Sequence, residues 1–231
     1  MNELRAVVFD LFGTLVPEFP LRDWDAMLRA MARGLGADEG AFRAEWGATL
    51  LDRQTGRLGD MEGNVRAICE RLRIDPAPDR IAAALEARAE VNRRLFHPKP
   101  ETVPVLGWLR ANGYATALLS MCAPDAPAMW HASAMAGLID EPLFSSEVGL
   151  RKPDPEFYLL AASRLGVEPQ VCLYVGDGAY RELSGAAAVG MRPVLIRDAS
   201  GGEDQVLRPD ADDWVQPSIG SLAEIPELLA G

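Results

Sequence analysis

Residues 6–15 read AVVFDLFGTL, a short apolar run that ends in a carboxylate and a turn. Ala6–Phe9 predicts a buried β-strand, because the run is continuously apolar and stops at Asp10. Gly13 and Thr14 then turn the chain. A carboxylate at the end of a buried strand can attack an electrophile and form a covalent intermediate. A lone aspartate in such a turn more often only caps it, so the rest of the sequence has to decide between the two interpretations.

From residue 101 onward, helical and strand patterns alternate along the chain. Expected strands are Ala115–Leu119, Leu143–Ser146, Val171–Val175 and Pro193–Ile196, and expected helices are Val103–Ala111, about 126–137, Pro155–Leu165, about 181–189 and Ser218–Leu229. This alternation predicts an α/β fold with a doubly wound, Rossmann-like parallel sheet. Such sheets place their sites at the carboxyl ends of the strands, which selects Asp10, Ser120 and Asp177.

Residues 17–98 differ from the rest of the chain, because every periodic stretch in them is helical. The helical stretches are WDAMLRAMARGLG, AFRAEWGATLLDR, GNVRAICERLRI and RIAAALEARAEVNRRLF. Pro17 and Pro20 precede them, and Pro98 and Pro100 follow them. We therefore predict a core domain formed by residues 1–16 and 99–231, with a four-helix cap domain inserted at residues 17–98.

Composition excludes several classes of protein. The chain has 231 residues, 48% hydrophobic residues and a formal net charge of -11. No basic stripe of the kind typical of nucleic-acid binders is present, and no apolar run approaches the roughly 18 residues that span a bilayer. Three cysteines without short spacing argue against a disulfide framework or a zinc cluster. Since the first residues lack the features of a signal peptide, we expect a cytoplasmic protein.

Two further charged positions strengthen the interpretation of Asp10. Lys152 precedes Pro153, and this rigid setting favours a lysine that neutralises the nucleophile and a bound anion, although most lysines are simply solvated. Asp177 and Asp10 form a pair of carboxylates on neighbouring strand ends, which suits Mg²⁺. Glu182 either accepts from metal-bound water or only favours the helix dipole.

The four segments that carry these residues resemble the ordered motifs of the haloacid dehalogenase-like superfamily. They are FDLFGTL at 9–15, LLS at 118–120, SSEVGLRKPDPEFY at 145–158 and VGDGAYRELSGAAAVGM at 175–191, and the helical insert is similar to that family's cap. The resemblance implies a hydrolase with Mg²⁺ as cofactor. It implies the nucleophile Asp10, the anion-holding hydroxyl of Ser120, the neutralising Lys152, the loop-supporting Thr14, and a metal site of Asp10, the Phe12 carbonyl, Asp177 and Glu182.

The first motif departs from the pattern of the family's phosphatases. By resemblance, these enzymes usually have a second aspartate two residues after the nucleophile, where this chain has Phe12. Phe12 cannot supply general acid–base help, typically worth about 10²–10⁴-fold. An aromatic residue there resembles the family's 2-haloacid dehalogenases. By the same resemblance, however, those enzymes are metal-free, with a serine near the position where this chain keeps Asp177, and they have an asparagine near the halide where this chain has Met121. We therefore expect Mg²⁺-dependent hydrolysis of a small phosphorylated metabolite. Carbon–halogen hydrolysis and a weakly active phospho-ligand-binding protein are the alternatives.

Residues of the insert should select the substrate, because lids over a fixed site set specificity. Arg53 and Arg57 lie between two predicted helices, where either side chain could bind a carboxylate or phosphate of an anionic substrate. The simpler interpretation of each is a solvated arginine at a helix end. No nucleic-acid or membrane partner is expected, and the chain is expected to be a monomer or a homodimer.

Overall fold

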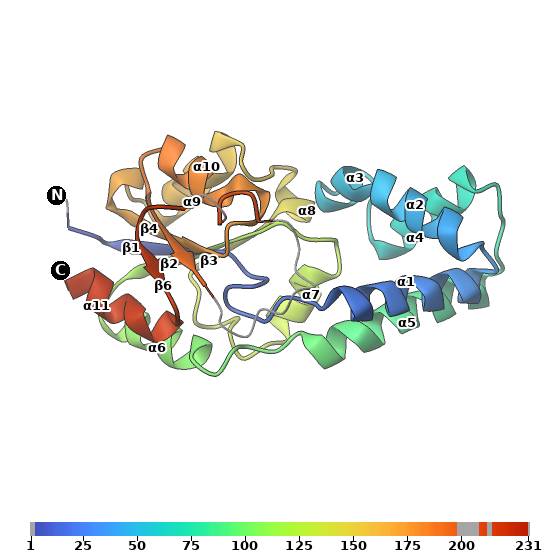
Figure 1. The fold of residues 1–231 in the computed structure, drawn as a ribbon, viewed down its shortest axis with the longest axis horizontal. Coiled ribbons are helices and arrows are strands. Elements are labelled where there is room, and N and C mark those ends of the chain that lie inside the picture. Colours follow the sequence, from blue (N-terminus) through green and yellow to red (C-terminus); the bar gives the residue numbers. More distant parts are fainter. Residues whose placement is uncertain (1–2, 198–207, 212–213, 231) are drawn as a thin grey trace.

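The computed structural model describes residues 3–197, 208–211 and 214–230 of the chain. Its centre is a six-stranded sheet with the order β3-β2-β1-β4-β5-β6, in which every pair of neighbouring strands is parallel (Figure 1). The strands are β1 (Ala6–Phe9), β2 (Ala115–Ser120), β3 (Glu141–Phe144), β4 (Cys172–Gly176), β5 (Arg192–Ile196) and β6 (Ser218–Ile219). The order reverses beside β1, so the predicted doubly wound sheet is confirmed, with its switch point between β1 and β4.

Helices cover both faces of the sheet, which explains why its strands are apolar on both sides. Val7 and Phe9 of β1 pack on one face, against α6 (Thr102–Ala111), α7 (Ala126–His131) and α11 (Ile225–Ala230). Ala6 and Val8 pack on the other face, against α9 (Pro155–Leu165) and α10 (Glu182–Ala188). In Figure 1, α6 and α11 lie below the sheet, and α9 and α10 lie above it. The buried β1 therefore holds the residue that follows it, Asp10, in a fixed position.

The helical insert, residues 17–98, lies beside the sheet domain and has a hydrophobic core of its own (Figure 1). Its helices are α1 (Leu21–Leu35), α2 (Glu39–Ala48), α3 (Leu50–Gln54), α4 (Met61–Arg71) and α5 (Pro78–Leu95). The insert thus has five helices where the sequence predicted four. The expected single helix over AFRAEWGATLLDR ends at Ala48, and Thr49 turns the chain, with its hydroxyl donating to the carbonyl of Glu45 at 2.8 Å. Threonine side chains compete in this way with a continuous helix.

Three other segments differ from their predicted extents. The strand expected at Leu143–Ser146 spans Glu141–Phe144, and the short helix α8 (Ser145–Val148) follows it directly. The expected helix over about 126–137 ends at His131, where the Ser133 hydroxyl donates to the carbonyl of Trp130 at 2.7 Å. The expected last helix begins only at Ile225, because Ser218–Ile219 pairs with β5 and Ser221 caps the following turn. Among the described residues, no helix has both the length and the apolar character needed to cross a bilayer. None of these differences moves a strand end that carries a candidate site residue.

Candidate active site

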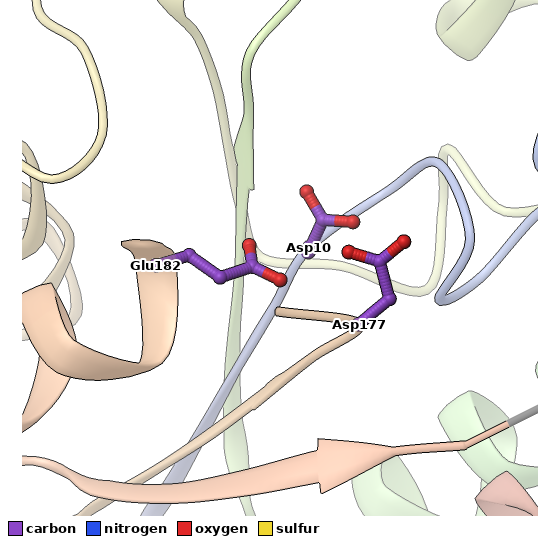
Figure 2. Close-up of side chains that lie close together, drawn as sticks. All are labelled: Asp10, Asp177 and Glu182. Atoms are coloured by element: carbon purple, nitrogen blue, oxygen red, sulfur yellow. The ribbon is translucent and has the colours of Figure 1, made fainter. Parts of the chain in front are cut away.

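Three neighbouring strands deliver the candidate residues to one edge of the sheet. Asp10 follows β1, Ser120 ends β2 and Asp177 follows β4. The register aligns Phe9 with Leu118 and with Val175, so the three strands end within two residues of one another. Figure 2 shows the carboxylates of Asp10 and Asp177 side by side, with that of Glu182 from the start of α10 pointing toward them.

Lys152 connects two of these carboxylates. Its Nζ donates to Oδ1 of Asp10 at 2.5 Å and to Oε2 of Glu182 at 2.6 Å, and its side chain is fully buried. Burial by itself would lower the pKa of Lys152, but the two carboxylates raise it above its ordinary value. Lys152 therefore stays a cation, and it neutralises Asp10, which lies 142 residues away in the chain.

Burial also acts on the carboxylates themselves. It raises the pKa of Asp10, with a further contribution from the charge of Asp177, while Lys152 opposes the shift. It raises the pKa of Glu182 to about 8, aided by the charge of Asp10. Because burial disfavours the ionised form of these carboxylates, a further cation beside them would stabilise that form.

Glu182 is held by more than the lysine. The Tyr174 hydroxyl donates to its Oε2 at 2.8 Å, and the backbone N–H of Gly178 donates to its Oε1 at 2.9 Å. Both oxygens thus have partners within the protein, so Glu182 positions Lys152 and the loop after β4. The sequence did not predict this role of Tyr174, because the residue lies inside an apolar strand and no motif marks it.

Asp177 is held by a second cation, Arg208, which the sequence did not predict. Nε of Arg208 donates to Oδ2 of Asp177 at 2.7 Å, and Nη2 of Arg208 donates to Oε2 of Glu18 at 3.2 Å. The backbone N–H of Ala179 donates to Oδ1 of Asp177 at 3.0 Å. Burial, together with the charge of Asp177, raises the pKa of Glu18 to about 7. No motif marks Glu18 or Arg208, since each lies in a segment without periodicity.

The geometry of the carboxylates fits a divalent cation. One oxygen each of Asp10, Asp177 and Glu182 lies within 4.8 Å of the others. Gly13 has a φ of +83°, and a Cβ there would lie 2.1 Å from Oδ2 of Asp177, so only glycine lets the two loops approach this closely. Carboxylate oxygens are the ligands that Mg²⁺ prefers. The Phe12 carbonyl as a further ligand stays a prediction.

Two buried hydroxyls, one in the turn after β1 and one at the end of β2, have no hydrogen-bond partner among the described residues. Among the described residues, Oγ1 of Thr14 and Oγ of Ser120 form no hydrogen bond, although both side chains are fully buried. Buried polar groups normally have hydrogen-bond partners, so the lack of partners for these two hydroxyls needs an explanation. Oxygen atoms of a bound anion would provide acceptors for both.

A cavity of about 300 Å³ opens between the sheet domain and the helical insert. Its lining includes Asp10, Phe12, Glu18, Arg53, Met121 and Tyr180. The ring of Phe12 packs edge-on against Phe19 with centroids 5.4 Å apart, so an apolar wall lies where an acid was missing from the motif. Met121 lines the same cavity, and its sulfur accepts from the backbone N–H of Lys152 at 3.3 Å.

The two candidate arginines of the insert lie in different environments. Arg53 is 1% exposed and lines the cavity. Arg57 is exposed, and its Nη1 forms an ion pair with Oδ1 of Asp52 at 3.2 Å, outside the cavity lining. Arg57 therefore has the environment of a solvated arginine, which was the simpler of the two interpretations of the sequence. A substrate role for either residue stays a prediction.

The loop after Asp177 also joins the insert to the site. Tyr180 and Arg181 have φ values of 53° and 54°, a left-handed conformation that non-glycine residues seldom adopt. Nε2 of Gln54 in the insert donates to the hydroxyl of Tyr180 at 3.0 Å. Backbone strain of this kind persists where surrounding contacts hold it in place, and it commonly occurs at functional sites.

Comparison with known proteins assigns this arrangement to a family. The model of the haloacid dehalogenase-like hydrolases matches residues 4–190. The chain is 30% identical over 217 residues to a glyceraldehyde 3-phosphate phosphatase from Methanopyrus kandleri, covering 92% of this chain and 91% of that protein. It is 27% identical over 241 residues to (S)-2-haloacid dehalogenase 1 from a Pseudomonas species, covering 99% of this chain and 98% of that protein.

Among solved structures, the chain is similar to an enzyme of the same family from Bacteroides thetaiotaomicron in complex with magnesium and inorganic phosphate. The TM-score is 0.65 at 17% identity, over 87% of this chain and 97% of that chain. The family match and the parallel sheet together define the class of protein, a hydrolase with a Rossmann-like core. The chain belongs to the haloacid dehalogenase-like hydrolases, as the four motifs predicted.

Proposed function

We propose that the protein is a Mg²⁺-dependent hydrolase of a small phosphorylated metabolite, with Asp10 as its nucleophile. The observation that carries this proposal is the cluster of Asp10, Asp177 and Glu182, whose oxygens lie within 4.8 Å of one another beside Lys152. An intact set of metal-binding carboxylates serves a reaction in which negative charge develops. The phosphatase from M. kandleri and the magnesium- and phosphate-containing structure from B. thetaiotaomicron support the same chemistry.

The chain's own residues have definite roles in this reaction. A carboxylate oxygen of Asp10 attacks phosphorus, the bond from phosphorus to the leaving oxygen breaks, and an aspartyl phosphate forms. Water then attacks phosphorus and regenerates Asp10 with release of phosphate. Lys152 holds Asp10 in place and neutralises charge, while the hydroxyls of Ser120 and Thr14 donate to phosphate oxygens. The bound Mg²⁺ would supply further positive charge against the transferring phosphoryl group.

Glu18 supplies the proton that Phe12 cannot provide. It lines the same cavity as Asp10 and immediately precedes Phe19, the residue against which the ring of Phe12 packs. With a pKa raised to about 7, its carboxyl is partly protonated near neutral pH, which suits a general acid. Glu18 donates its proton to the leaving oxygen and then accepts a proton from the attacking water.

The helical insert acts as the cap of this site. Its residues and those of the sheet domain line one cavity, so the insert covers the nucleophile and shapes the space beside it. Three predictions from the sequence accompany this proposal: an anionic small molecule as the partner, a cytoplasmic location, and a monomeric or homodimeric state.

Dehalogenation is the second candidate function, and the apolar wall at Phe12 favours it. A halide leaves without a proton, so this reaction needs no acid at that position, and the chain is 27% identical to a 2-haloacid dehalogenase. A third alternative is a weakly active protein that binds a phosphorylated ligand without turnover.

Activity assays separate the three candidates. Purified protein should release phosphate from p-nitrophenyl phosphate and from a panel of small phosphate esters in the presence of Mg²⁺, and EDTA should abolish the release. Release of chloride from 2-chloropropionate in the absence of metal would contradict the proposal in favour of dehalogenation. Binding of phosphate esters with no turnover across the panel would contradict it in favour of the ligand-binding protein.

A further inference from the structure

The helical insert places two buried arginines near the cavity, and one of them is fully paired. Nε and Nη2 of Arg88 donate to Oδ2 and Oδ1 of Asp125 at 2.6 and 3.0 Å. Nδ2 of Asn92 donates to Oδ2 of Asp125 at 2.6 Å. Because the fork of the guanidinium matches the carboxylate, the charge of Arg88 is neutralised within the protein.

Arg53 has no such partner. Its Nη2 donates to the carbonyl of Trp46 at 2.5 Å and its Nε donates to Oγ1 of Thr49 at 3.3 Å, and both acceptors are uncharged. Its guanidinium lies 4.0 Å from the centre of the Trp46 ring, a cation–π contact. Within the described part of the chain, no carboxylate forms an ion pair with Arg53. A buried charge without a counter-ion is costly unless a ligand pairs with it.

The charge on Arg53 persists at neutral pH. Burial and the nearby charge of Arg88 lower the pKa of Arg53 to about 9, and Asp125 only partly opposes this shift. Taken together, Arg53, Arg88 and Asp125 leave one positive charge at the insert side of the cavity. A single carboxylate would neutralise that charge, whereas a second phosphate dianion would leave an excess of negative charge.

The cavity places Arg53 and Asp10 in one space of about 300 Å³. Apolar side chains line the cavity as well, among them Trp24, Phe19 and Met129. A space of this size takes a molecule of a few carbon atoms with an anionic group at each end. Hydrogens on Nη1 and Nη2 of Arg53 that are not used within the protein form a fork suited to a carboxylate.

We propose that Arg53 binds the carboxylate of a small phosphorylated carboxylic acid whose phosphate group lies at Asp10. This inference rests on the proposed function for the phosphate end of the substrate. It assigns Arg53 as the residue that determines specificity, and it makes carboxylate-bearing phosphate esters the preferred substrate class.

A pair of esters tests the assignment directly. Carboxymethyl phosphate and ethyl phosphate have similar size, but only the first has a carboxylate. With Mg²⁺, we expect the wild-type protein to have a kcat/KM about 10- to 100-fold higher for carboxymethyl phosphate, the range for a hydrogen-bonded charged group. Equal kcat/KM values for the two esters, or a preference for ethane-1,2-diyl bisphosphate over carboxymethyl phosphate, would overturn the proposal.

Variants of Arg53 test whether this residue causes the preference for carboxymethyl phosphate. We expect Arg53→Gln to lower the ratio of kcat/KM for carboxymethyl phosphate to kcat/KM for ethyl phosphate toward one, and Arg53→Lys to retain part of the preference. Arg66→Gln is the matched control, since Arg66 is an exposed arginine of the insert paired with Glu62, and it should keep the full preference. Full preference in a folded Arg53→Gln protein would contradict the assignment. If circular dichroism shows that this variant is unfolded, the Arg53→Lys and wild-type comparisons decide.

Binding of non-hydrolysable phosphonates separates failure of this inference from failure of the proposed function. Titration calorimetry with Mg²⁺ should give a Kd for phosphonoacetate about 10- to 100-fold lower than for ethylphosphonate, whether or not the protein turns over esters. No turnover combined with this preference would reject the proposed hydrolysis and support the carboxylate site. Turnover of esters without this preference would reject the carboxylate site and support the proposed hydrolysis.

Discussion

Lys152 at the strand ends and Arg53 in the helical insert are both buried cations, but they have different partners. At the strand ends, Lys152 lies between Asp10 and Glu182 at 2.5 and 2.6 Å. In the insert, Arg53 is equally buried, and its polar and ring contacts within the described residues are a hydroxyl, a carbonyl and an aromatic ring. The first arrangement holds reacting groups in place before a substrate arrives. The second leaves a positive charge that, in our proposal, the carboxylate of the substrate neutralises.

The largest effect should come from removing the nucleophile. We expect Asp10→Asn to lower kcat for phosphate-ester hydrolysis by about 10⁴-fold or more, because the aspartyl phosphate can no longer form. Phosphate release by the purified variant measures this loss, and binding of phosphonoacetate serves as the control for an intact cavity. Retention of more than a few per cent of the activity in a folded variant would place the nucleophile elsewhere.

Removing the proposed acid should give a smaller loss that depends on the leaving group. The general acid must be protonated, and the pKa of Glu18 is raised to about 7, so kcat/KM for an alkyl phosphate should fall as pH rises above about 7. Glu18→Gln should lower kcat/KM for ethyl phosphate by about 10²-fold and remove this fall. For p-nitrophenyl phosphate, whose leaving group needs no proton, the effect should be slight.

The same comparison of esters contains the result that would contradict this role. An equal loss on both esters would mean that Glu18 acts through Arg208 on the position of Asp177, since Arg208 joins the two carboxylates. In that case the fall of kcat/KM above pH 7 should persist in the variant.

Stability measurements sharpen the contrast between buried and exposed ion pairs. Lys152→Met leaves the carboxylates of Asp10 and Glu182 facing each other without a cation, and we expect the free energy of unfolding to fall by about 3 kcal/mol at pH 8. The loss should shrink as pH decreases, since Glu182, with a pKa of about 8, takes up a proton. Urea denaturation at pH 8 and pH 6 measures both quantities.

An exposed pair in the insert provides the control for that measurement. Arg66→Met removes the partner of Glu62, and both side chains are 49% exposed, so the loss should stay below about 1 kcal/mol. If Lys152→Met lowers the free energy of unfolding by no more than this control does, Lys152 does not stabilise the protein by neutralising Asp10 and Glu182.

The smallest effect should come from Arg57. Its side chain is exposed and paired with Asp52, so Arg57→Gln should change kcat/KM for carboxymethyl phosphate less than about twofold, the scale of a weak surface interaction. A loss as large as that of Arg53→Gln would show that Arg57 reaches the substrate when the insert moves.

Strand-end residues could be predicted from the sequence because local patterns mark them. Asp10, Ser120 and Asp177 each come where an apolar strand ends, and a parallel sheet brings such ends together. Lys152 was marked by the prolines beside it. The extent of single helices was less predictable, because side chains such as Thr49 interrupt a helix through hydrogen bonds that periodicity does not show.

The residues that escaped prediction depend on tertiary contacts. Arg208 reaches Asp177 across 31 residues of sequence, and Tyr174 reaches Glu182 from inside an apolar strand. Arg53 lies within α3, where its Nε donates to Oγ1 of Thr49, whereas Arg57 follows that helix and is exposed. Spacing alone gives two arginines four residues apart the same weight.

Turnover in H₂¹⁸O, followed by mass spectrometry of the peptide that contains Asp10, tests the central claim most directly. Attack of water on phosphorus should place ¹⁸O in the released phosphate and leave the carboxylate of Asp10 unlabelled. A labelled Asp10 carboxylate would show that water attacks its carbonyl carbon, as in hydrolysis of a carbon ester intermediate, and would contradict the phosphoryl-transfer account.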